Sequence, residues 1–197
     1  MDTKTLAVLE WPQVVDLLAK QATNAMGRDR CYAIEILYKM DEVSAALRLT
    51  TECKELLQVT GGLPLGGFSD VRASLKRVSQ GYVLAGEELV AIAHTLQSGK
   101  RLKEYLLDRK EDFPVLAELA EPIAVLGDLA SEIIRSFDPS GELSDSASPE
   151  LARLRLKIRE AQAKVRQSLQ RIIQGQSSAL QDAIITMRGD RYVLPVR

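Results

Sequence analysis

Apolar residues over the first 146 positions occur in short blocks at three- and four-residue spacing, separated by glycine, proline or aspartate. This spacing is typical of amphipathic helices, and the separating residues are typical of helix ends and turns. The blocks predict helices over about 11–27, 29–37, 41–60, 72–80, 86–111, 114–122 and 128–137. Gly99, inside one of these blocks, suggests a close backbone approach. Asp138–Gly141, after the last block, predicts a turn. We therefore expect residues 1–146 to form a compact helical core domain of six or seven helices.

The longest apolar pattern follows a helix start signal at Ser148. A serine hydroxyl can accept a hydrogen bond from the first helical turn, Pro149 fits the first helical position, and Glu150 places negative charge at the positive helix end. One narrow apolar seam follows, interrupted by polar Ser168: Leu151, Leu154, Ile158, Ala161, Val165 and Ile172. A helix over 149–174 contains 26 residues and is about 39 Å long at a rise of 1.5 Å per residue. We expect such a rod to protrude from a small domain.

The apolar pattern changes period after Gly175. Ile184–Thr186 and Tyr192–Leu194 are typical of strands, and Arg188–Asp190 is expected to form the hairpin turn between them. Because a lone two-stranded hairpin is marginally stable in water, we expect the natural protein to continue into a β-domain. The predicted fold is thus mainly α: a multi-helix core bundle, a long protruding helix over 147–175, and the start of a small β-domain over 176–197.

Charge is distributed unevenly along the chain, although the net charge is only −1. Residues 1–149 contain 16 Lys and Arg against 23 Asp and Glu, which gives −7. Residues 150–197 contain 10 against 4, which gives +6. A basic segment on an acidic body suggests contact with a polyanion, and the alternative is a solvated helix face.

Few residues suggest catalysis. His94 is the only histidine, and the two cysteines, Cys31 and Cys53, lack the paired spacing of a zinc site. The glycines of 63–70 come without the lysine and the preceding strand of a nucleotide phosphate loop. No signal peptide and no apolar run of roughly 20 residues is visible. We therefore expect a cytoplasmic protein with reduced thiols, and no catalytic, cofactor or metal site in this chain.

Three segments carry a resemblance to a known family: LPLGGFSDVR (63–72), SDSASPELARLR (144–155) and ITMRGDRYVLPVR (185–197). In this order and spacing they resemble the N-terminal region of the second bacterial MutS-type paralogue, a relative of the mismatch-repair ATPase. The resemblance implies that residues 1–146 form the core domain and that 147–175 form a lever helix. It also implies that 176–197 begin a clamp domain, and that the seam packs on a returning lever helix outside this chain.

The resemblance further implies activities that this chain does not carry by itself. Similar proteins continue into a dimerising ATPase, which uses ATP and Mg²⁺, and usually into a Smr-type endonuclease domain. They suppress homologous recombination by acting on branched DNA, and some are associated with splitting collided ribosomes, which would make ribosomal RNA the partner. We therefore expect a homodimeric full-length protein that binds DNA or the ribosome and has no membrane contact.

Six arginines are the candidate nucleic-acid contacts, three on the long helix and three in the hairpin: Arg155, Arg159, Arg166, Arg188, Arg191 and Arg197. Contacts from such residues to phosphates would give affinity without reading sequence. Two alternatives remain open at this point. The hairpin arginines can act as strand-edge charges that discourage aggregation. The seam of 151–172 can instead make this chain a helical dimerisation module with no nucleic-acid role.

Overall fold

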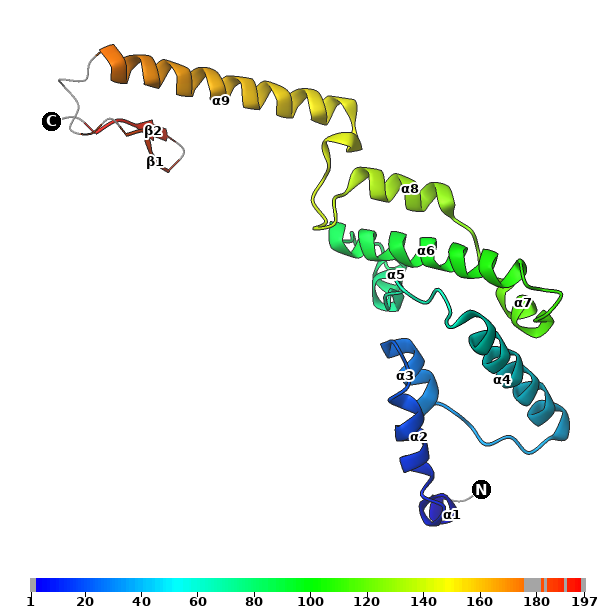
Figure 1. Ribbon diagram of the computed structural model, residues 1–197. Coiled ribbons are helices and arrows are strands. Elements are labelled where there is room, and N and C mark those ends of the chain that lie inside the picture. The colour runs from blue at the N-terminus through cyan, green and yellow to red at the C-terminus, as the bar shows by residue number, and fades with distance from the viewer. Residues whose placement is uncertain (1–2, 176–181, 183, 190, 196–197) are drawn as a thin grey trace. The chain divides into compact units, whose positions relative to one another are not determined.

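The computed structural model describes residues 3–175, 182, 184–189 and 191–195. The chain divides into two compact units, Met1–Leu143 and Ser144–Arg197. The described residues form nine α-helices, one short 3₁₀-helix and one two-stranded sheet (Figure 1), so the expectation of a mainly α fold with a small β element is confirmed. The helices of the first unit are α1 (Thr3–Val8), α2 (Trp11–Ala19), α3 (Ala25–Tyr32), α4 (Met40–Thr60), α5 (Arg72–Ser79), α6 (Gly86–Leu107), α7 (Pro114–Ala120) and α8 (Gly127–Ser136).

Three helix ends in the first unit lie where glycine or proline predicts them. Gly61 takes a φ of 72° directly after α4, and Gly81 takes a φ of 85° shortly after α5. Both values fall in the left-handed region that glycine adopts without steric cost. α7 begins at Pro114, where the missing amide hydrogen costs nothing.

Two expectations about the first 40 residues are wrong. The helix predicted to run to Gly27 ends at Ala19, and α3 starts at Ala25 rather than at Asp29, because the Asn24 side chain caps it by accepting a hydrogen bond from the Gly27 amide at 2.7 Å. α3 then ends at Tyr32 rather than near Leu37. In addition, α1 was not predicted, so the described part of residues 1–146 contains eight α-helices rather than six or seven.

Two small apolar cores lie on α6. Five buried side chains from α4, α6, α7 and the segment before α7 form the first core: Leu56, Leu106, Phe113, Leu116 and Ala120. Three more from α6 and α8 form the second: Ala93, Ala130 and Ile133. α1 and α3 pack against α2, but large apolar side chains there, such as Val8 and Leu17, stay exposed.

Gly86 and Gly141 approach each other too closely for either to carry a side chain. A Cβ atom on Gly86 would lie 1.9 Å from the carbonyl oxygen of Gly141, which leaves no room for any side chain. Gly141 itself takes a φ of 80° and ends the predicted turn, in which its amide donates to the Asp138 carbonyl at 3.0 Å. The close approach expected at Gly99 is wrong, because that position meets only the side chain of Ile123 at an ordinary 3.6 Å.

The second unit contains the 3₁₀-helix η1 (Asp145–Ala147), the helix α9 (Pro149–Gly175) and strands β1 (Thr186–Arg188) and β2 (Arg191–Val193). Figure 1 shows α9 as one uninterrupted helix. Its predicted cap is confirmed, since the Leu151 amide donates to Ser148 Oγ at 3.1 Å. The predicted strand limits are wrong: pairing of Arg188 with Arg191 extends the antiparallel ladder to the turn, so Arg188 belongs to β1.

Candidate nucleic-acid interface

The three helix arginines are spaced four and seven residues apart on α9, which places them on one face of the helix. Arg155 and Arg159 both contact Asp145 of η1. Arg155 Nη1 donates to Asp145 Oδ1 at 2.7 Å, while Arg159 Nη1 and Nη2 lie 3.3 and 3.4 Å from Oδ2. Arg166 lies almost two turns further along and makes no ion pair with any residue that the structure describes. Near the start of α9 the arginines of this face are thus ion-paired, whereas Arg166 further along the helix is not ion-paired with any described residue.

We call Asp145, Arg155 and Arg159 the Asp145 clasp. Two serine caps hold the backbone on both sides of Asp145: Ser144 Oγ accepts from the Ser146 amide at 3.2 Å, and Ser148 caps α9. The hydrogen bond from Arg155, followed by the bond and charge of Arg159, holds the pKa of Asp145 below its ordinary value. Asp145 is therefore ionised at neutral pH and offsets positive charge at the base of α9.

The two hairpin arginines that the structure describes lie directly opposite each other across the β1–β2 ladder. Directly opposed side chains share one face of a two-stranded sheet, and like charges in that position destabilise the pair. Both residues are exposed, and neither forms an ion pair with a described residue. Arg188 and Arg191 therefore form a concentrated positive group. The third predicted hairpin contact, Arg197, lies outside the described residues.

The apolar seam of α9 is also open to solvent. The helix buries none of its residues, and Ile158, in the middle of the seam, is 56% exposed. Leu154, Val165 and Ile172 are exposed to a similar degree. In the described structure α9 thus presents both a seam without a covering partner and a row of arginines.

The chain was compared with known proteins. No protein-family model matches it. Curated proteins named Endonuclease MutS2 align with 100% of this chain, at 37% identity in Pelotomaculum thermopropionicum, 39% in Geobacillus sp. strain WCH70 and 35% in Brevibacillus brevis. The chain belongs to the MutS2 family. It spans only about a quarter of these relatives, since the matches cover 25%, 26% and 26% of their lengths.

The glycine-rich loop that marks this MutS2-family sequence does not fit a nucleotide phosphate. The Gly66 carbonyl accepts a hydrogen bond from Ser98 Oγ at 2.8 Å, and Arg101 also reaches it. A Cβ atom on Gly67 would lie 2.6 Å from the same hydroxyl. The loop is therefore packed against α6, with Ser98 fully buried beneath it, and its glycines serve that contact.

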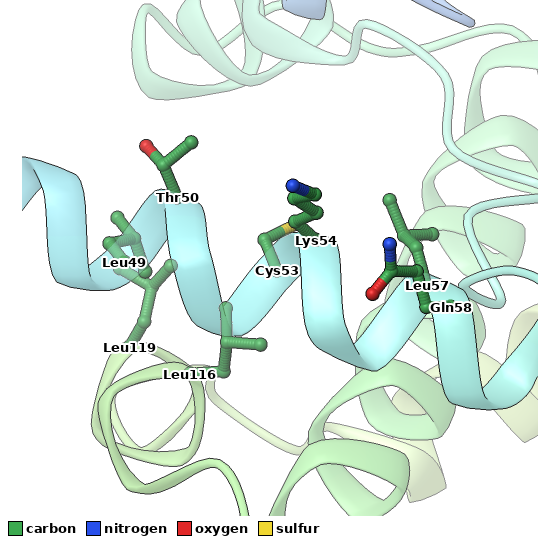
Figure 2. A pocket seen from close by; sticks show the side chains of 8 residues that line it. All are labelled: Leu49, Thr50, Cys53, Lys54, Leu57, Gln58, Leu116 and Leu119. Carbon is green, nitrogen blue, oxygen red and sulfur yellow. The ribbon is translucent and has the colours of Figure 1, made fainter.

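The histidine is the remaining candidate for chemistry that the sequence of this MutS2-family chain offers. His94 is exposed on α6, and no group of three or more His, Cys, Asp or Glu side chains in the described part of the chain could hold a metal ion. Figure 2 shows an apolar groove of about 700 Å³, lined by α4 residues, including Leu49 and Cys53, and by Leu116 and Leu119 of α7. It contains one charged group, Lys54, and no acid–base pair. None of the described helices is long and apolar enough to span a membrane.

Sequence reasoning named Arg155 and Arg159 but missed Asp145, which holds both of them. Asp145 lies in residues 144–155, one of the three segments that carry the resemblance to the MutS2 family, but it was not among the predicted contacts. The sequence feature that could have indicated this contact is an acidic residue shortly before a capped helix that carries two arginines one turn apart. A chain that folds back at its cap can bring such residues together.

Proposed function

We propose that this chain forms the core, the lever helix and the first clamp strands of a MutS2-type endonuclease, and that its second unit contacts nucleic-acid phosphates. The opposed pair of Arg188 and Arg191 carries the proposal. Two positive side chains at directly opposed ladder positions have an electrostatic cost that a bound phosphate backbone reduces. Arg166 is a further candidate contact, and Arg197, outside the described residues, stays a prediction. The name Endonuclease of the relatives supports a nucleic-acid substrate.

The activity of the whole protein is part of this proposal. This chain spans about a quarter of the relatives' length. We assign to the other three quarters the binding of ATP and Mg²⁺, homodimerisation and the Smr-type nuclease. The client that we propose is branched DNA, on which the full-length protein acts to suppress homologous recombination. The competing client is the collided ribosome, which the full-length protein would split and whose ribosomal RNA would bind the same arginines.

The first test measures the salt dependence of binding in the full-length protein with Arg188→Gln/Arg191→Gln. Removing two phosphate contacts is expected to reduce the slope of log K against log salt by about 2. The matched control is Arg28→Gln/Arg30→Gln, which removes two exposed charges from α3 of the first unit. The probes are a four-way DNA junction, a linear duplex and purified ribosomes. Unchanged binding to all three would remove the hairpin from the proposal.

The exposed seam supports a second candidate function, dimerisation through α9 without nucleic acid. Ile158→Asp is expected to abolish any helicity of α9 that rises with protein concentration, because it places a charge in the middle of the seam. Leu156→Asp is the matched control, since Leu156 is similarly exposed, at 50%, but lies on another face. Helicity that is independent of concentration in the unsubstituted chain would exclude this candidate.

A further inference from the structure

The Asp145 clasp has the geometry of an anion site. Two guanidinium groups from successive turns of α9 converge on one carboxylate, and each approaches a different oxygen. Three N–H groups take part, at distances of 2.7 to 3.4 Å. The two arginines are thus arranged around a single negatively charged group.

A phosphate group presents the same features to arginine as a carboxylate does. Both offer neighbouring anionic oxygens that match the planar fork of the guanidinium group. A nucleic-acid phosphate could therefore bridge Arg155 and Arg159 through two of its oxygens in the place of Asp145. The aspartate marks where such an anion would bind.

The occupying carboxylate can be displaced. The side chain of Asp145 is 44% exposed, and the side chain of Arg159 is 59% exposed. Ion pairs at this exposure contribute little to stability because water and salt screen them. The caps at Ser144 and Ser148 hold the backbone on both sides without help from the clasp.

We propose that Arg155 and Arg159 form a phosphate-binding site for nucleic acid, and that Asp145 occupies this site in the free chain and competes with the ligand. The inference rests on the proposed function and adds regulation to it. In the free chain Arg166 and the hairpin pair are available at once, whereas Arg155 and Arg159 become available only after Asp145 is released. Binding through the base of α9 thus requires an exchange of one anion for another.

Asp145→Asn in the full-length protein tests the competition. Asparagine keeps the shape of the side chain but removes its charge, so both arginines are freed. Affinity for a fluorescein-labelled DNA duplex, measured by anisotropy, is expected to rise about three- to tenfold, and the salt slope to steepen by about 1, because the two arginines share one phosphate. In Arg155→Gln/Arg159→Gln protein the same Asp145→Asn change is expected to have no such effect.

Glu150→Gln is the matched control. Glu150 forms an exposed ion pair with Arg153 on the same helix, at 2.7 Å. The substitution therefore alters net charge by the same amount and also frees an arginine, but it leaves the clasp intact. A gain in affinity with Asp145→Asn that only equals the gain with Glu150→Gln would overturn the inference, as would a gain that persists without Arg155 and Arg159.

A second readout needs no nucleic acid. Phenylglyoxal modification of Arg155 and Arg159, followed by mass spectrometry, is expected to be faster in Asp145→Asn, and also in Asp145→Ser should the first variant fold poorly. Faster modification without tighter duplex binding would mean that Asp145 is a structural brace, which overturns the inference and leaves the hairpin proposal standing. If no variant binds the junction, the duplex or ribosomes, the proposed function fails and this inference fails with it.

Discussion

In the unit of residues 1–143, Leu56 and Ala93 are fully buried between helices, whereas in the second unit the 27-residue helix α9 buries none of its residues. The first unit is stabilised mainly by removal of apolar surface from water. The contacts at the base of α9 are instead local and polar: the Ser148 cap, which stabilises the helix start, and the exposed ion pairs of the Asp145 clasp. The two regions therefore respond to different kinds of substitution.

The difference has a functional consequence. An amphipathic helix gains most of its stability in a protein from packing of its apolar face. The seam of α9 lacks this packing within the described chain, so the helix presents both its apolar seam and its arginines to other molecules. Among the described residues, the apolar seam of α9 therefore has no packing partner.

The largest effect is expected from Leu56→Ala. Leu56 is fully buried among α4, α6 and α7, and loss of a buried leucine leaves a cavity that costs about 2–5 kcal/mol. Denaturant unfolding followed by circular dichroism should show this loss. Leu57→Ala is the matched control, since its neighbouring side chain is 42% exposed, and its cost should be below about 1 kcal/mol. Equal costs would show that burial does not stabilise the first unit.

The next effect is expected from Gly86→Ala. The new Cβ atom would collide with the Gly141 carbonyl, which forces the turn away from α6 and costs about 1–3 kcal/mol. Gly127→Ala is the control, because Gly127 is also the first residue of a helix but has open space around it. Thermal unfolding should separate the two variants, and equal melting temperatures would contradict the close approach.

Local features were predictable from the sequence where a single residue decides the backbone. The limits of α9 were predicted to within one residue, because Ser148 and Pro149 start the helix and Gly175 ends it. Gly61 and Pro114 likewise marked real helix limits. The apolar seam was also predicted from periodicity, which shows which face is apolar but not what covers it. That its covering helix lies outside this chain came only from the family resemblance.

Features that join distant residues were not predictable. Gly86 and Gly141 meet across 55 positions of sequence, and only the packing of α6 against α8 brings that turn to the start of α6. Asp145 reaches Arg155 and Arg159 because η1 folds back along α9, and no residue spacing specifies that direction. For the candidate site, the sequence therefore identified the arginines but not the aspartate that pairs with two of them.

A smaller effect is expected from Ser148→Ala, which removes the cap of α9. Loss of a serine cap costs about 1 kcal/mol, so the first turn of α9 should fray and total helicity should fall slightly. Ser168→Ala is the matched control in the same helix and should act in the opposite direction, because alanine favours the helix interior by up to about 0.7 kcal/mol. Circular dichroism measures both, and a fall in helicity with both variants would contradict the capping role.

The smallest effect is expected from acidification and tests the clasp directly. The pKa of Asp145 is lowered chiefly by the Arg155 hydrogen bond, so the clasp contributes fully above the ordinary aspartate pKa of about 3.9 and is lost as the pH falls through the lower value in the folded chain. Carboxyl ¹³C NMR measures the midpoint. Arg155→Gln should raise the midpoint, and Arg159→Gln should raise it less, because the Arg159 contacts are longer, at 3.3 and 3.4 Å against 2.7 Å.

Asp70 of the first unit gives this titration an internal reference. The side chain of Arg72 lowers the pKa of Asp70 to about 2, and this pair lies outside the second unit. The Asp70 midpoint should therefore stay unchanged in both arginine variants while that of Asp145 rises. If the Asp145 midpoint does not rise in Arg155→Gln, the clasp is not closed in solution. Arg155 and Arg159 would then already be free, and the base of α9 would be held by its serine cap alone.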